Sequence, residues 1–252
     1  MINKYLNNNK FKIEFQTIYP VIDNNNSVVN KLNSSYSPYK IEPYKFISQI
    51  IHKDDYRDGG VPFFWHPLQM SMTLDKLINP DKINKDPFFK DVYSIMRNGI
   101  FMHDVGETLH SKGFDVNSWL NYMKKLDENE VNQYIIEETR YFTNLKNLPR
   151  EEHFNEINNY DRFMRFILHF NKFLDIYNNS LSIRKYAGKK KTNERISKLK
   201  TDSKFIKKAY NVITKDNLSE IIKDFNLVYN ISKLTQTNLS NNIEEYKQQI
   251  AA

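Results

Sequence analysis

Cysteine is absent from this chain of 252 residues, and glycine is scarce, with only six residues. The absence of cysteine excludes a disulfide scaffold, thiolate metal ligands and a cysteine nucleophile. Long hydrophobic runs are missing too, because no apolar stretch approaches the roughly 20 residues that cross a bilayer. The amino terminus also lacks the apolar segment of a signal peptide. We therefore expect a soluble, cytoplasmic protein that has no membrane partner.

A glycine-rich phosphate loop is also absent from the sequence, which excludes nucleotide sites built on such loops. The chain carries a formal net charge of +7, and a basic balance is typical of proteins that bind nucleic acid. Lysine is abundant here together with asparagine and isoleucine, however, which is typical of AT-rich coding. The net charge therefore does not indicate a nucleic-acid partner.

Hydrophobic residues make up 40% of the chain and recur mostly at helical spacing. The spacing predicts helices over residues 41–51, 66–78, 92–109, 116–141, 151–184 and 203–234. Residues 79–89 (NPDKINKDPFF) predict a turn-rich break, and Asn217 with Glu220 predicts a helix start with a capping box. Strand signals are confined to the Asn-rich residues 1–40, where we expect an arm with a short strand or hairpin. The fold class is therefore predicted to be mainly α-helical.

His66 follows a group of aromatic residues and precedes Pro67, which suits the first turn of a helix because its missing N–H needs no partner there. A buried or capping histidine with a satisfied hydrogen bond is the ordinary interpretation of such a residue. On its own, His66 predicts no function.

His103 and Asp104 end a strongly apolar helical pattern, and Glu107 follows one turn later. Residues three and four apart share a face of a helix, so Glu107 is expected to lie close to both. Burial of such groups without partners costs several kcal/mol. A divalent metal ion would compensate that cost.

Lys172, Asp175 and Asn179 fall along one stripe of another predicted helix. A solvated polar face with a Lys–Asp pair is the ordinary interpretation of this segment by itself. Its functional meaning depends on what else the fold brings to it.

In their order along the chain, His66, the pair His103-Asp104 and Asp175 resemble the HD superfamily of metal-dependent phosphohydrolases. The flanking residues are similar to the RelA/SpoT-type branch of that superfamily, the enzymes that hydrolyse the alarmones ppGpp and pppGpp in the stringent response. The resemblance implies an HD-domain helical bundle and one divalent metal ion, expected to be Mn²⁺. It also implies hydrolysis of the alarmone 3′-pyrophosphate to GDP or GTP and pyrophosphate.

Three segments carry this resemblance: HKDDYRDGGVPFFWHPL at residues 52–68, FMHDVGETL at 101–109 and KFLDIYNN at 172–179. The similarity extends over roughly residues 43–185. It implies a small stand-alone hydrolase, because the chain is too short for the further domains of the long bifunctional enzymes.

The sequence also predicts a division of the chain into three parts. We expect an Asn-rich arm at 1–40, the HD hydrolase domain at 41–200, and a C-terminal helical extension at 201–252 that packs on the hydrolase domain.

The metal ligands that the resemblance implies are His66, His103, Asp104 and Asp175. Two imidazoles and two carboxylates suit a divalent ion such as Mn²⁺, and the lack of thiols argues against a structural zinc site.

Glu107 matches the catalytic glutamate of the branch, which orients or deprotonates the attacking water. Thr108 follows it at the second catalytic position, where a threonine can hydrogen-bond a water but cannot act as a base. For the substrate, the resemblance implies that Arg57 contacts the guanine base and that Asn179 contacts the sugar region. Lys172 is assigned to the same substrate-binding group, or holds its helix in place.

Two departures from the branch leave alternatives open. The branch has Glu-Asp where this chain has Glu107-Thr108, and residues 79–89 lengthen the spacing between His66 and His103. One alternative is an HD phosphohydrolase of another nucleotide, such as a dNTP, a cyclic nucleotide or a dinucleotide. The other is a catalytically weakened HD fold that binds a nucleotide or a protein partner. A homo-oligomer is left open as well.

Overall fold

The structure is a computed structural model that describes residues 43–57, 60–145, 148, 152–183 and 188–251. The contacts divide the chain between Phe46 and Ile47, and the candidate site discussed below lies within the second unit, Ile47–Ala252. The described residues are mainly helical and include no strand, which confirms the predicted fold class. The expected strand or hairpin at 1–40 lies outside the described residues.

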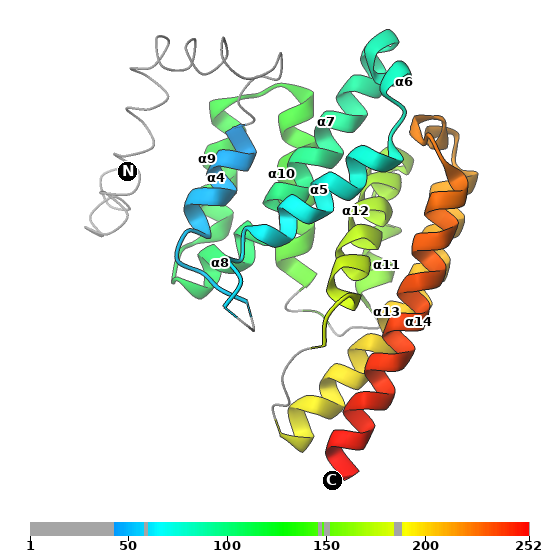
Figure 1. Ribbon diagram of the computed structural model, residues 1–252. Coiled ribbons are helices and arrows are strands. Elements are labelled where there is room, and N and C mark those ends of the chain that lie inside the picture. Colours follow the sequence, from blue (N-terminus) through cyan, green and yellow to red (C-terminus); the bar gives the residue numbers. More distant parts are fainter. Residues whose placement is uncertain (1–42, 58–59, 146–147, 149–151, 184–187, 252) are drawn as a thin grey trace. The chain divides into compact units, whose positions relative to one another are not determined.

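The helices follow one another along the chain as shown in Figure 1. They are α4 (Pro43–Ile51), α5 (Trp65–Leu77), α6 (Pro80–Lys85), α7 (Pro87–Met102), α8 (Val105–Ser111), α9 (Val116–Leu126), α10 (Glu130–Leu145), α11 (His153–Ile157), α12 (Arg162–Ser180), α13 (Lys189–Lys215), the 3₁₀-helix η1 (Asn217–Ile221) and α14 (Phe225–Ala251).

Helix α12 lies at the centre of the second unit and packs against α5, α7, α10, α11, α13 and α14. Its apolar residues point to all sides, as expected for a helix that is covered all round, and Phe166, Phe170 and Phe173 are fully buried. Polar side chains on such a helix need partners inside the protein, because an unpaired buried polar group is costly. The partners of the polar residues of α12 therefore define the interior chemistry of the fold.

The segment 79–89 was expected to be a turn-rich break but contains the short helix α6. The side chain of Asn79 accepts a hydrogen bond from the Asp81 backbone N–H at 3.1 Å, and Pro80 takes the first helical position. Asp86 caps α7 in the same way, by accepting from the Phe88 N–H at 3.0 Å. Asn79 and Asp86, which favoured a turn in the sequence, therefore each cap the start of a helix.

The predicted capping box at Asn217 was wrong by one residue. Asp216 is the N-cap of η1, and its carboxylate accepts a hydrogen bond from the Leu218 backbone N–H at 3.0 Å. Aspartate and asparagine are both favoured N-cap residues, so Asp216 and Asn217 compete for the unpaired backbone N–H groups at the start of the helix.

Helices α13 and α14 pack along each other and both contact α12 (Figure 1). The expected domain boundary at residue 200 lies inside α13, and the three-part division of the chain stays a prediction. Among the described residues, none of the helices combines the length and the apolar character that a membrane crossing needs.

Candidate metal centre

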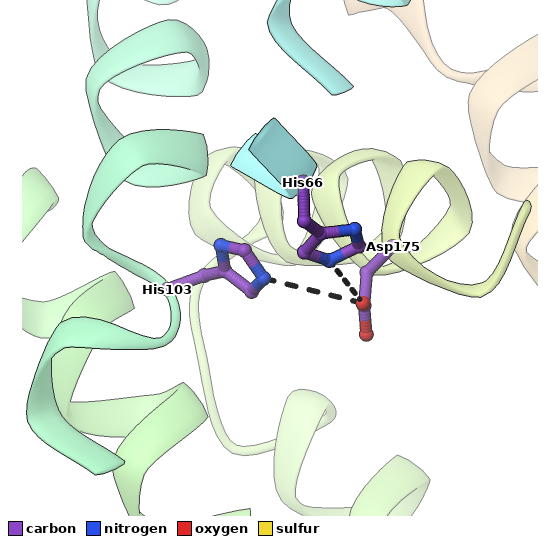
Figure 2. Close-up of side chains that lie close together, drawn as sticks. All are labelled: His66, His103 and Asp175. Carbon is purple, nitrogen blue, oxygen red and sulfur yellow. Dashed lines mark hydrogen bonds and ion pairs between the residues drawn. The ribbon is translucent and has the colours of Figure 1, made fainter. Parts of the chain in front are cut away.

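Three side chains from distant segments of the chain converge in the interior (Figure 2). His66 is the second residue of α5, His103 follows the last residue of α7, and Asp175 lies in α12. His66 Nε2 is 3.1 Å from Asp175 Oδ1, and His103 Nε2 is 4.0 Å from the same oxygen. One donor atom from each of the three lies within 4.8 Å of the others, and all three residues are buried. This group is therefore able to hold a metal ion.

The orientation of His103 depends on a break in the helix. The apolar pattern predicted one helix over 92–109, but α7 ends at Met102 and α8 begins at Val105. At this junction the Nδ1–H of His103 donates to the Ile100 carbonyl at 2.6 Å, so that Nε2 faces the cluster. A backbone partner on one ring nitrogen commonly orients a metal-binding histidine in this way.

The polar atoms around His103 Nε2 fit a bound cation. Nε2 is buried without a hydrogen-bond partner among the described residues, although Asp104 Oδ2 lies only 3.0 Å away. Burial alone lowers the pKa of His103, but Asp104 and then Asp175 outweigh burial and raise it to about 8. A neutral ring nitrogen and two carboxylates repel one another unless a proton or a metal ion lies between them.

Asp104, the fourth predicted ligand, lies beside the group of three and lines the same cavity. Burial raises the pKa of its carboxyl, but the neighbouring His103 outweighs this and holds the pKa below its usual range. Asp104 is thus a charged carboxylate next to the His66–His103–Asp175 group, and its role as a ligand stays a prediction.

The protonation states of the other two residues suit metal binding. Burial lowers the pKa of His66 and leaves its imidazole neutral. Burial acts to raise the pKa of Asp175, but Lys172 overcomes it and holds the carboxyl well below its usual range. Metal ions bind neutral imidazole and ionised carboxylate.

The predicted substrate-binding residues form a chain of contacts that ends on Asp175. Lys172 Nζ donates to Asp175 Oδ2 at 2.6 Å, and the Asn179 amide donates to Asp175 Oδ1. Arg57 Nη1 donates to Asn179 Oδ1 at 3.2 Å, and its guanidinium lies 5.1 Å from the centre of the Phe63 ring. Lys172 and Asn179 therefore orient Asp175, whatever else they bind.

The His66–His103–Asp175 group lies in the wall of a cavity of about 800 Å³. Glu107 lines this cavity together with three cationic side chains, Arg57, Lys172 and Lys198. A pocket with several cations attracts anionic ligands, and its volume is typical of sites for small molecules and cofactors.

Thr108, the residue in place of the second acid, does not line this cavity. Its hydroxyl oxygen lies 3.2 Å from His52 Nδ1, and His52 stacks on Phe63 with ring centres 4.6 Å apart. Burial lowers the pKa of His52 to about 4, so this ring is neutral near pH 7. Thr108 therefore joins α8 to the segment after α4, while Glu107, the residue before it in α8, lines the cavity.

Sequence reasoning gave no role to two residues of the site, His52 and Lys198, and it expected the aromatic residues before His66 only as part of a nucleotide-facing loop. His52 opens the first motif segment, so its position was a signal, although nothing in the sequence showed that Thr108 is its partner. Trp65 belongs to the aromatic group before His66. Lys198 lies beyond the region of resemblance, and only the packing of α13 brings it to the cavity.

Comparisons of this chain with protein-family models, with curated proteins and with solved structures find no match.

Proposed function

We propose that this protein is a metal-dependent nucleotide phosphohydrolase, and that it removes the 3′-pyrophosphate of guanosine alarmones. One observation carries the proposal: the buried His66–His103–Asp175 group in the wall of a cavity lined by cations. The resemblance of the flanking segments to RelA/SpoT-type hydrolases supports the choice of substrate, and the donor set supports Mn²⁺ as the ion.

A divalent ion held by this group would supply Lewis-acid polarisation of a phosphoryl group and activation of water. The chain's own residues account for the other requirements. Lys172 and Asn179 hold the Asp175 carboxylate in one orientation from two sides, and Glu107 offers a carboxylate on the cavity wall that can take the proton of the attacking water.

Phosphate binding is assigned to the cations of the cavity. Arg57 and Lys172 approach it from the side of Asp175, and Lys198 approaches it from α13. Planar guanidinium groups bind phosphate through bidentate hydrogen bonds and stack on purines. Arg57 is thereby suited to either the phosphate or the base of the substrate.

The test measures pyrophosphate release from ppGpp by the purified protein, first treated with a chelator and then supplied with Mn²⁺. We expect release only with metal, and we expect it to disappear in His103→Ala and in Glu107→Gln. His110→Ala provides a matched control, because His110 is exposed on α8 and does not line this cavity. Full activity of the chelated protein would contradict the proposal.

A second candidate function is nucleotide binding without turnover, and the contact between Thr108 and His52 favours it. This contact leaves Glu107 as the acidic residue of α8 on the cavity wall. The same assay separates the candidates: tight ppGpp binding with no release from metal-loaded protein supports the second. Release from a dNTP, a cyclic nucleotide or a dinucleotide, but not from ppGpp, would retain the hydrolase and change its substrate.

A further inference from the structure

Exposed apolar side chains line the cavity that contains the His66–His103–Asp175 group. Four large apolar residues that line it remain well exposed: Tyr56 (64%), Leu181 (52%), Trp65 (49%) and Val61 (43%). Single exposed hydrophobic residues are common on proteins, but a group of them at one cavity is typical of a binding site. This apolar rim needs a ligand with an apolar or planar part.

Trp65 is placed next to the metal group by the chain itself, since it begins α5 and His66 follows it. Gln69 lies one turn further along α5, on the same face as Trp65, and lines the same cavity. No ring contact of Trp65 is found within the described part of the chain. Trp65 and Gln69 thus line the cavity from adjacent turns of α5.

The position of Tyr56 is set by a short antiparallel turn. Tyr56 and Pro62 form a bridge, the Arg57 N–H donates to the Val61 carbonyl at 2.8 Å, and the Phe63 N–H donates to the Asp55 carbonyl at 2.9 Å. Backbone pairing on both sides of Tyr56 holds its exposed ring at the rim.

We propose that Trp65 and Tyr56 form an aromatic platform on which the nucleobase of the substrate stacks, with the Gln69 amide able to hydrogen-bond the edge of the base. This inference rests on the proposed function, and it names the residues that select a nucleotide over a plain phosphate ester. Stacking of a base on an aromatic ring contributes enough to affinity that removal of the ring weakens binding about tenfold.

The continuity of the rim with the metal group favours a nucleobase over a segment of another protein. A ligand that stacks on Trp65 has its phosphates next to His66 and within a cavity that carries Arg57, Lys172 and Lys198. A stable protein interface needs about 800 Å² from each partner, whereas these four side chains border one cavity of about 800 Å³, a volume typical of small-molecule sites.

The experiment uses Trp65 as its own reporter. The chain has two tryptophans, so Trp119→Phe leaves Trp65 as the source of tryptophan emission. We expect GMP to quench this emission in chelator-treated protein, and pyrophosphate alone to leave it unchanged. The matched control is Trp65→Phe with Trp119 retained, whose emission should not respond to GMP.

Binding of GMP is then measured by calorimetry in Trp65→Ala, Trp65→Phe and Gln69→Ala. Trp65→Ala should weaken binding about tenfold, while Trp65→Phe should keep most of the affinity because a ring remains. Tyr229→Ala serves as a control, because Tyr229 is 45% exposed on α14 and is not among the residues that line the cavity. Equal melting temperatures of the variants exclude a loss of folding, and the exposure of Trp65 makes such a loss unexpected.

The failure of this inference and the failure of the proposed function give different results. If GMP quenches Trp65 but no substrate is hydrolysed, the platform stands and the hydrolase proposal falls. If ppGpp is hydrolysed with an unchanged KM in Trp65→Ala, or if pyrophosphate quenches as strongly as GMP, the platform is overturned.

Discussion

Asp175 lies on α12 and Glu138 contacts α12 from α10; both carboxyl groups are buried, but their surroundings differ. Asp175 accepts hydrogen bonds from Lys172 and Asn179, and Lys172 holds its pKa well below the usual range. Glu138 is enclosed between α7, α10 and α12, where Asn171 donates to its Oε1, and burial raises its pKa to about 8. One carboxyl is therefore charged near pH 7 and the other is a neutral acid.

Two adjacent residues of α12 account for this difference. Lys172 brings a positive charge to Asp175 and opens onto the cavity, whereas Asn171 brings an amide to Glu138 and also donates to the Met96 carbonyl at 2.8 Å. A buried carboxyl with a cationic partner stays ionised and can bind metal, while one with a neutral partner keeps its proton. Burial alone thus does not identify a reactive carboxyl group, because the hydrogen-bond partner determines whether the group is ionised.

The largest effect is expected from removal of Asp175. Asp175→Ala leaves Lys172 buried without its counter-charge, which costs about 3–5 kcal/mol of unfolding free energy, and pyrophosphate release should fall below detection. Denaturant unfolding and the release assay measure the two effects. The double variant Lys172→Met, Asp175→Leu should recover most of the stability but no activity. Recovery of activity would show that Asp175 is not a metal ligand.

Removal of the neutral acid should cost less. Glu138→Ala leaves a cavity and an Asn171 amide that loses one partner, at a cost of about 2–3 kcal/mol. Glu138→Gln keeps the shape and the neutral state, so near pH 4.5 its unfolding free energy should lie within about 1 kcal/mol of the parent protein. At pH 7 the variant should be the more stable of the two, because the parent must keep Glu138 protonated. A large loss in Glu138→Gln would mean that Glu138 is ionised in the folded protein.

The raised pKa of Glu138 also predicts a dependence of stability on pH. Between the ordinary value of 4.5 and about 8, the folded protein holds a proton that the unfolded chain has released. Stability from this group is therefore complete below pH 4.5 and is lost as pH rises through 8. Denaturant midpoints from pH 5 to pH 9 should fall more steeply in the parent protein than in Glu138→Gln. Parallel curves for the two proteins would refute the raised pKa.

The smallest effect is expected from Lys198, a cation of α13 that lines the cavity next to Asp175. Lys198→Gln removes one cation of the cavity and should raise KM about two- to fivefold with little change in kcat, in keeping with the small contribution of a partly exposed charge. Lys200→Gln is the matched control, because Lys200 is exposed on the same helix and does not line this cavity. Equal KM values in the two variants would exclude Lys198 from substrate binding.

The sequence was informative about Asp175 and silent about Glu138. His66, His103 and Asp175 stood out because their order and flanking segments resemble the HD superfamily, and the structure brings all three together. Glu138 lies 33 residues from Asn171, and its burial depends on Gly99. A Cβ at that glycine would lie 1.8 Å from Glu138 Oε2. Such a close approach of two helices has no local signature.

The helix break at His103 was missed for a related reason. The apolar spacing continues from α7 into α8 without a proline, so periodicity alone predicted one continuous helix. The contacts of Lys172 and Asn179 with Asp175 were equally out of reach, because a motif gives the residue types of a site and not the bonds among them. Helix positions are local properties, whereas partners are set by tertiary packing.

The His66–His103–Asp175 group joins positions that are far apart in the chain, since Asp175 lies 109 positions after His66. A cation bound by α5, the α7–α8 junction and α12 would act as a reversible cross-link that closes two long loops of the unfolded chain. By mass action, it would raise the free energy of unfolding with the logarithm of the free metal concentration. Resistance of the protein to proteolysis would then follow the supply of divalent metal, independently of whether substrate is present.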